Sequence, residues 1–150
     1  MRTIMILSIA AWLGIAAAER VDAALPEAFG PVDAEVVWVD FWASWCTPCR
    51  RSFPWMNAMQ DKYGDDGLVI IGVNVDSDPA EAASFLASYP PDFEIRYDPD
   101  GELATEFGVV AMPSSYVFDR DGELVERHLG FKVKLQDEYE TLLRESLAAD

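Results

Sequence analysis

The only two cysteines of this 150-residue chain stand three positions apart, in a setting that suits redox chemistry. They lie in the segment Trp45-Cys46-Thr47-Pro48-Cys49. At the start of a helix this spacing brings both sulfurs within one turn, close enough to form a disulfide. The free N–H groups at that helix end favour a thiolate at Cys46 and lower its pKa from about 8.5.

A thiolate at Cys46 is a nucleophile that attacks a disulfide, and Cys49, placed deeper in the helix, then resolves the mixed disulfide. Thr47 and Pro48 are predicted to modulate this reaction, because they alter the first helical turn and the hydrogen-bond donors near the thiolate.

Two other uses of the cysteines are open. A structural disulfide here would close a loop too small to add much stability. A zinc site would need two further ligands, and the only other clear candidate, His128, stands far along the chain. We therefore predict no metal site, and we expect His128 to be a surface or half-buried strand residue.

The segments around the cysteines place them at a junction between a strand and a helix. Residues Val36–Ala43 are a β-branched and aromatic run with a single acid, which is typical of a buried central strand. Residues Arg50–Tyr63 repeat apolar side chains at helical spacing. Cys46 therefore lies between the end of the strand and the start of the helix.

The rest of the chain alternates strand and helix patterns. The predicted strands are 68–75, 93–97, 114–119 and 123–129, and the predicted helices are 79–88, 102–107 and 135–148. Residues 120–122 join the last two strands in a hairpin. This order predicts an α/β fold with a central mixed β-sheet flanked by helices.

The N-terminus has the pattern of a secretory signal. Arg2 is followed by an uncharged apolar run, Thr3–Ala18, that ends in small residues. Small residues permit cleavage after Ala18 or after Ala23, and the sequence does not choose between them. The run is shorter than the roughly 20 residues that cross a bilayer. An uncleaved membrane anchor is the alternative to a signal peptide at residues 1–23.

Residues 24–150 are expected to form one domain, because the chain is 51% hydrophobic and has no linker that would divide it. Acidic residues outnumber basic residues 27 to 11, which gives a net charge of −16 at pH 7. Such a charge repels phosphate backbones. Nucleic-acid binding is therefore excluded.

The cysteine motif and a second segment together resemble a known family. The stretches Val39–Asn57 (VDFWASWCTPCRRSFPWMN) and Gly108–Gly122 (GVVAMPSSYVFDRDG) resemble thioredoxin-like thiol-disulfide oxidoreductases of the bacterial envelope, the TlpA-like branch in particular. The resemblance implies a thioredoxin fold with an inserted helix-strand segment between residues 76 and 98. It also implies that Pro113, preceded by Met112, is in the cis form beside the cysteines.

Asp40 stands six residues before Cys46, where thioredoxins carry a buried acid. By this resemblance Asp40 accepts the proton of Cys49, through water, when the mixed disulfide resolves. Burial in the strand is expected to raise the pKa of Asp40. The alternative is a carboxylate on a solvated strand face. Thioredoxin pairs this acid with a lysine on the next strand, but the matching stretch, Ile71–Asn74, has none.

An apolar rim around Cys46 is expected from Trp45, Met112, Trp42 and Trp55, although Trp42 suits the core equally well. Trp45, Met112 and Pro113 are predicted to bind an extended substrate segment, with the backbone of Met112 pairing as an added strand does.

These residues predict an exported, periplasmic protein that reduces disulfides in other exported proteins, including cysteines destined for haem or copper, as in cytochrome c biogenesis. Because an oxidising compartment keeps such a pair oxidised, a membrane partner is expected to supply electrons, and without one the protein would work as an oxidase. No cofactor is implied. The alternative function is a copper metallochaperone on the same fold, although that function would call for a third residue between the cysteines.

Overall fold

The computed structural model describes residues 24–149. The predicted signal peptide, its two cleavage positions and its alternative as an anchor lie outside the described residues. The elements are η1 Glu27–Phe29, β1 Val36–Trp42, α1 Cys49–Tyr63, η2 Gly64–Asp66, β2 Leu68–Asn74, α2 Pro79–Ser88, β3 Glu94–Tyr97, α3 Glu102–Glu106, β4 Ser114–Asp119, β5 Leu124–Leu129, η3 Val133–Leu135 and α4 Gln136–Leu147, where η marks a short 3₁₀ segment.

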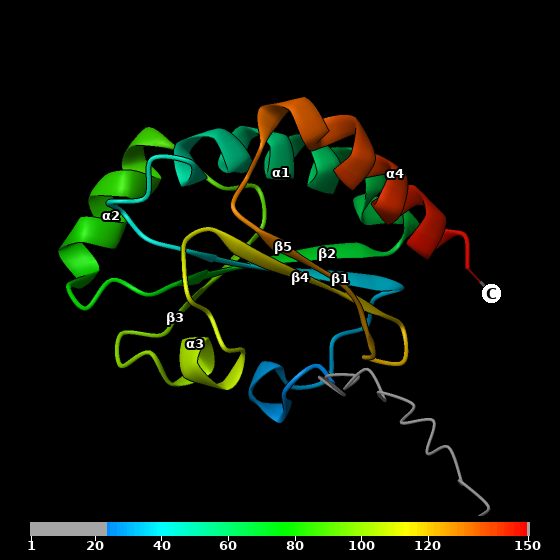
Figure 1. Ribbon diagram of the computed structural model, residues 1–150, viewed down its shortest axis with the longest axis horizontal. Coiled ribbons are helices and arrows are strands. Elements are labelled where there is room, and N and C mark those ends of the chain that lie inside the picture. Colours follow the sequence, from blue (N-terminus) through cyan, green and yellow to red (C-terminus); the bar gives the residue numbers. More distant parts are fainter. Residues whose placement is uncertain (1–23, 150) are drawn as a thin grey trace, which may run out of the picture.

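The strands form one mixed sheet in the order β3-β2-β1-β4-β5. β1 runs parallel to β2 and antiparallel to β4. β3 extends the sheet parallel to β2, and β5 extends it antiparallel to β4. In Figure 1, α1, α2 and α4 cover one face of the sheet and α3 and η1 lie on the other. The predicted α/β architecture, including the inserted α2–β3 segment, is confirmed.

Strand β1 lies in the middle of the sheet, and all seven of its residues are buried. Alternate side chains of a strand point to opposite faces, so β1 contributes to two cores. Trp38 and Trp42 pack in the core under α1, whereas Val39 and Phe41 belong to the core on the α3 face. Asp40 occupies the same face as the two tryptophans, which is the face that the cysteines approach.

The β4–β5 hairpin follows the predicted turn. Its connection is held by Asp119, whose carboxylate accepts hydrogen bonds from the backbone N–H groups of Asp121 and Glu123 at 3.0 and 2.9 Å. Gly122 has a φ of 77°, a conformation that favours glycine. β5 begins at Leu124, one residue later than predicted, and Glu123 forms an isolated β-bridge with Ala24 instead.

Several other predicted boundaries differ by one residue, and three short segments differ from expectation as well. β1, β2 and α3 each end one residue earlier than predicted, at Trp42, Asn74 and Glu106. α1 begins one residue earlier and β3 one residue later than predicted, and α4 is one residue shorter at each end. The three 3₁₀ segments were not expected, because three residues are too few to show a periodic pattern. The bounds of α2 and β4 are as predicted.

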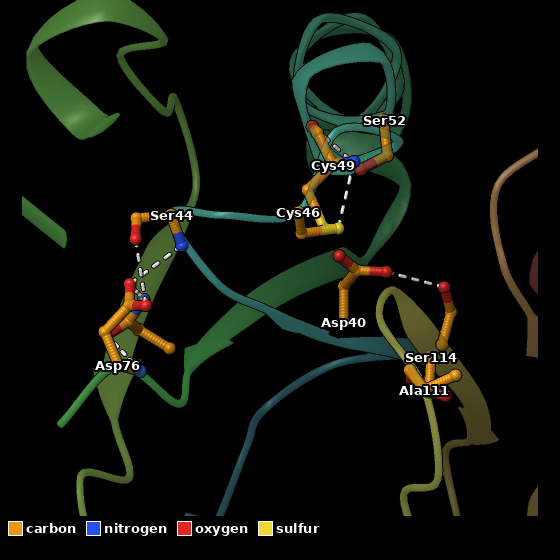
Figure 2. The surroundings of a disulfide bond; sticks show 10 residues. Asp40, Ser44, Cys46, Cys49, Ser52, Asp76, Ala111 and Ser114 are labelled. Carbon is orange, nitrogen blue, oxygen red and sulfur yellow. Dashed lines mark hydrogen bonds between the residues drawn. A yellow bond between two sulfur atoms is a disulfide. The ribbon is translucent and has the colours of Figure 1, made fainter. Parts of the chain in front are cut away.

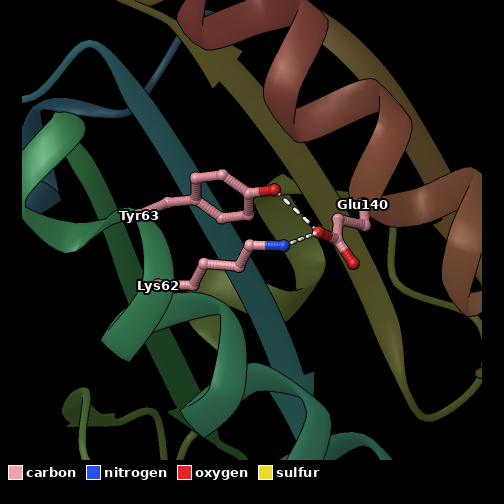
Figure 3. A network of polar contacts seen from close by, with 3 residues as sticks. All are labelled: Lys62, Tyr63 and Glu140. Carbon is pink, nitrogen blue, oxygen red and sulfur yellow. Dashed lines mark hydrogen bonds and ion pairs between the residues drawn. The ribbon is translucent and has the colours of Figure 1, made fainter.

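Helices α1 and α4 are also joined at their surface (Figure 3). The carboxylate of Glu140 on α4 accepts hydrogen bonds from Lys62 at 2.5 Å and from the Tyr63 hydroxyl at 2.7 Å. The hydrogen bond from Lys62 and that from Tyr63 both lower the pKa of Glu140. Exposed ion pairs contribute little to stability, so the burial of α4 against the sheet matters more.

We predict that Leu143→Ala, in the fully buried face of α4, lowers the free energy of unfolding by about 2–5 kcal/mol, because it leaves a cavity in the core. Urea denaturation of the oxidised protein measures this change. Leu129→Ala is the matched control, because Leu129 is 54% exposed, and its effect is expected to stay below about 0.5 kcal/mol. Equal losses in the two variants would contradict the observed packing of α4.

Candidate active site at the start of helix α1

The two cysteines form a disulfide at the junction of β1 and α1 (Figure 2). Their Cα atoms are 5.3 Å apart, and their sulfurs are bonded at 2.00 Å. Cys49 is the first residue of α1 and is fully buried, whereas 3% of Cys46 remains exposed. The predicted position of the pair at a strand-to-helix junction, with Cys49 the deeper residue, is confirmed.

The sulfur of Cys46 faces the amino end of α1. The backbone N–H of Cys49 donates a hydrogen bond to the Cys46 sulfur at 3.2 Å. Pro48 precedes the helix with a helical φ of −63° and has no N–H of its own, so Cys49 provides the first amide of the helix. Such a donor stabilises negative charge on sulfur once the disulfide is reduced. Thr47 is exposed in the turn between the two cysteines.

Asp40 lies in β1 directly beneath this junction, with its carboxyl group pointing toward the disulfide (Figure 2). Only 1% of the residue is exposed, so the alternative of a solvated carboxylate is wrong. The Ser115 hydroxyl donates a hydrogen bond to its Oδ1 at 2.6 Å, and its Oδ2 has no partner among the described residues. Burial raises the pKa of Asp40 to about 7, against the opposing effect of the hydrogen bond from Ser115.

The neighbouring strand β2 brings no side chain to Asp40. Its residue opposite Asp40 is Gly72. A Cβ atom at Gly72 would lie 3.0 Å from side-chain atoms of Ile95 and Phe93 and 3.2 Å from the Trp42 indole nitrogen, so the glycine makes room for these three side chains. The absence of the lysine that thioredoxin places on this strand is therefore a feature of the packing here.

Asp76 is a polar residue of the site that the sequence analysis missed. Its carboxylate accepts hydrogen bonds from the backbone N–H and the hydroxyl of Ser44, at 2.8 and 3.0 Å. It also accepts one from the Asn74 side chain at 2.8 Å. These contacts tie the turn before Cys46 to the carboxyl end of β2 (Figure 2). The signal available in the sequence was a polar pair, Asn74 and Asp76, directly after a buried strand.

The expected apolar rim divides into exposed and buried residues. Trp45 is 65% exposed beside Cys46, and Met112 is half-buried. Trp42 and Trp55 do not belong to the rim, because both are buried in the core under α1. For Trp42 the core alternative is confirmed, whereas the expectation for Trp55 was wrong, since aromatic residue type alone does not determine burial.

The segment at the start of β4 completes the site. The Met112–Pro113 peptide bond is cis, as the resemblance implied. The Pro113 carbonyl accepts a hydrogen bond from the Gly130 N–H at 2.8 Å, which joins this segment to the end of β5. The backbone N–H and C=O of Met112 have no hydrogen-bond partner among the described residues.

His128 packs against the sheet and not against the cysteines. It is half-buried on β5 and stacks on Trp38, with ring centroids 5.5 Å apart. Within residues 24–149, no group of three or more histidine, cysteine or acidic side chains is arranged to hold a metal ion.

The fold and the cysteine pair together define a protein of the thioredoxin-like class. Comparison of the amino-acid sequence gives the family: residues 31–143 match Redoxin, and the chain belongs to this family. The resemblance to thioredoxin-like thiol-disulfide oxidoreductases is thereby confirmed.

Two curated relatives show the same relationship. The thiol-disulfide oxidoreductase ResA of Bacillus thuringiensis subsp. konkukian is 33% identical over 104 residues, which cover 69% of this chain and 60% of ResA. The thiol:disulfide interchange protein HelX of Rhodobacter capsulatus is 34% identical over 99 residues, which cover 65% of this chain and 54% of HelX. The matched region thus spans less than two thirds of either relative.

Solved structures share the fold. A crystal structure from Chlorobium tepidum, assigned as thiol:disulfide interchange protein DsbE, has a TM-score of 0.75 and 41% identity, covering 77% of this chain and 82% of that chain. StoA from Bacillus subtilis has a TM-score of 0.63 at 24% identity, covering 74% and 85%, and shows the fold alone.

Burial of Asp40 predicts a dependence of stability on pH. Its folded-state pKa of about 7 lies above the value of about 3.9 in an unfolded chain. The stability that Asp40 contributes is therefore fully present below about pH 4 and is lost as pH rises through about 7. Asp40→Asn has no such loss. As pH rises from about 4 to about 7, its free energy of unfolding therefore increases relative to that of the native protein, by up to roughly 4 kcal/mol.

Urea denaturation of both oxidised proteins across this pH range measures the difference. All other titrating groups are common to the two proteins and cancel in the comparison. Parallel curves of unfolding free energy against pH would contradict the assignment of a raised pKa to Asp40.

Proposed function

We propose that this protein is an exported thiol-disulfide oxidoreductase that reduces disulfides in other exported proteins. The observation that carries the proposal is the disulfide at the start of α1. The Cys46 sulfur accepts a hydrogen bond from the first amide of the helix, and Cys49 is fully buried. The names of ResA and HelX describe the same chemistry in relatives of this chain.

The reaction begins with the reduced cysteine pair. The Cys46 thiolate attacks one sulfur of a client disulfide, the client S–S bond breaks, and a bond forms between Cys46 and the client. The released client sulfur leaves as a thiolate and takes up a proton from solvent. The helical amide that now contacts Cys46 favours the attacking thiolate.

The second step releases the client. Cys49 loses its proton and attacks the Cys46 sulfur, so that the Cys46–Cys49 disulfide forms and the bond to the client breaks. Two electrons have then passed from the protein to the client disulfide. Asp40 receives the proton of Cys49, because its carboxyl group faces the disulfide and has a pKa of about 7.

The client is bound as an extended segment beside Cys46. Trp45 provides exposed apolar surface next to the sulfur. Met112 has a free backbone N–H and C=O among the described residues, directly before Pro113. An extended peptide pairs with such groups as an added strand does. Thr47 and Pro48 modulate the exchange, because they form the turn between the two cysteines.

A reductase in an oxidising compartment needs its own supply of electrons. The signal pattern in residues 1–23 supports export, and an oxidising compartment returns the cysteine pair to the disulfide state. A membrane partner must then supply electrons for each cycle. The TlpA-like resemblance supports clients whose cysteines are reduced before they bind haem or copper. No helix within residues 24–149 has both the length and the apolar character to cross a bilayer.

The roles of the cysteines predict opposite outcomes for two matched variants. Cys46→Ala abolishes disulfide exchange, because the attacking sulfur is lost. Cys49→Ala accumulates a mixed disulfide with the client, because the resolving sulfur is lost. Non-reducing electrophoresis and mass spectrometry of each variant, after incubation with envelope extract and a thiol reductant, measure both outcomes.

The Cys46→Ala, Cys49→Ala double variant is the control for contacts that do not involve these sulfurs. Accumulation of the mixed disulfide in Cys46→Ala and not in Cys49→Ala would reverse the assigned roles. Clients recovered from Cys49→Ala that are already reduced in cells lacking this protein would contradict the proposed direction of electron flow.

A further inference from the structure

A row of side chains leads from Asp40 to the edge of the sheet. Asp40 on β1 is opposite Ser115 on β4, and Ser115 is opposite His128 on β5. Residues directly opposite each other in antiparallel strands lie on the same face, with Cβ atoms about 4.5–5.5 Å apart. The row therefore runs on the face of the sheet that lies under the disulfide.

The row is polar in one direction only. On the other side of Asp40 the opposite residue is Gly72, and beyond it Ile95 on β3, neither of which has a polar side chain. Exposure increases toward β5, from 1% at Asp40 and 5% at Ser115 to the half-buried His128. Because β5 is an edge strand, the row meets solvent at His128.

The row has one hydrogen bond, between Ser115 and Asp40, and an acceptor without a partner at His128, and together these suit a proton carrier. No hydrogen bond joins Ser115 to His128 in the oxidised protein. Ser115 has a single hydroxyl hydrogen, and in the oxidised protein it is donated to Asp40. The Nε2 atom of His128 is buried and has no partner among the described residues. A neutral imidazole nitrogen can accept a proton, whereas the indole N–H groups of Trp38 and Trp42, which share this face, only donate.

Few charges face His128 from the surrounding elements. It contacts Trp38 of β1 and Tyr139 of α4, with ring centroids 5.5 and 4.8 Å away. Glu126, earlier on β5, favours protonation of His128, but burial has the larger effect and lowers its pKa. Near neutral pH the imidazole is therefore an acceptor rather than a fixed cation.

We propose that Asp40 exchanges its proton with solvent through the Ser115 hydroxyl and His128, at the edge of the sheet. The proposal rests on the proposed function of Asp40 in disulfide exchange and adds the route by which its proton leaves. His128 acts through Asp40 and does not contact the reacting sulfurs.

The transfer balances without any further reagent. When Cys49 attacks, its proton moves to the carboxylate of Asp40. The new O–H of Asp40 then donates to the Ser115 oxygen, and the Ser115 O–H turns to donate to the imidazole nitrogen of His128. The proton passes to His128, a Ser115 hydroxyl remains, and His128 releases a proton to water. Asp40 is again a carboxylate.

A side route matters because Asp40 lies beneath the disulfide and a bound client covers the surface above it. At about pH 6 most Asp40 is protonated, since its pKa is about 7, and it must lose that proton before it can accept one from Cys49. At about pH 8.5 it is already ionised. At low pH Asp40 therefore needs the route in order to lose its proton before Cys49 attacks. At high pH Asp40 can accept the proton of Cys49 at once, and one turnover does not require the route.

The test measures the resolving step alone. Reduced protein is mixed with a disulfide peptide, the reaction is quenched with acid, and the mixed disulfide is followed by mass spectrometry. We expect His128→Phe, which keeps an aromatic ring against Trp38, to slow resolution about tenfold at about pH 6 and to change it less than twofold at about pH 8.5. Ser115→Ala is expected to show the same pH dependence.

Two comparisons separate a proton route from a structural effect. In an Asp40→Asn background His128→Phe should have no further effect, because the carboxyl group it serves is absent. His128→Asn, which forms hydrogen bonds but does not titrate, should behave as His128→Phe, and it replaces that variant if the latter does not fold. The attack by Cys46 should be unchanged in all variants.

The proposal is overturned if both His128 variants keep the native pH profile, or if they slow resolution equally with and without Asp40. Failure of the proposed function is a different result, because the native protein would then form no mixed disulfide with the peptide at any pH.

Discussion

The hydrogen bond from the Cys49 amide to the Cys46 sulfur, at 3.2 Å, is the contact on which the chemistry of this protein depends. It exists because β1, buried along its whole length, delivers the chain to the amino end of α1. A sulfur held at this position faces the positive amino end of the helix, which stabilises a thiolate relative to a thiol. The turn that holds it is anchored from the other side by Asp76 through Ser44.

The buried carboxyl group of Asp40 complements this arrangement from below. Burial of this carboxyl group is unfavourable, because Asp40 has one hydrogen bond, from Ser115, and no cation on the adjacent strand β2. Desolvation brings its pKa to about 7, where a carboxyl group can both accept and release a proton near neutral pH. In the function we propose, helix α1 favours the Cys46 thiolate in the first step of disulfide exchange, and Asp40 of the sheet accepts the proton of Cys49 in the second.

Much of this fold follows from local sequence patterns. The bounds of α2 were predictable because Pro79 begins the helix and Asp78 caps it, accepting a hydrogen bond from the Ala80 N–H at 2.9 Å. The cysteine pair was predictable because its spacing matches one helical turn. The contact between Ser44 and Asp76 spans 32 residues and leaves no local pattern. The row from Asp40 to His128 depends on the register of β4 and β5, which a single sequence does not reveal.

The acidity of Cys46 tests this account most directly. In reduced Cys49→Ala protein a single thiol remains and the amide of residue 49 is retained, so the rate of iodoacetamide alkylation as a function of pH reports the pKa of Cys46 alone. The account predicts a pKa at least about one unit below the value of about 8.5 for free cysteine. A pKa at or above that value would show that the helix does not stabilise the thiolate.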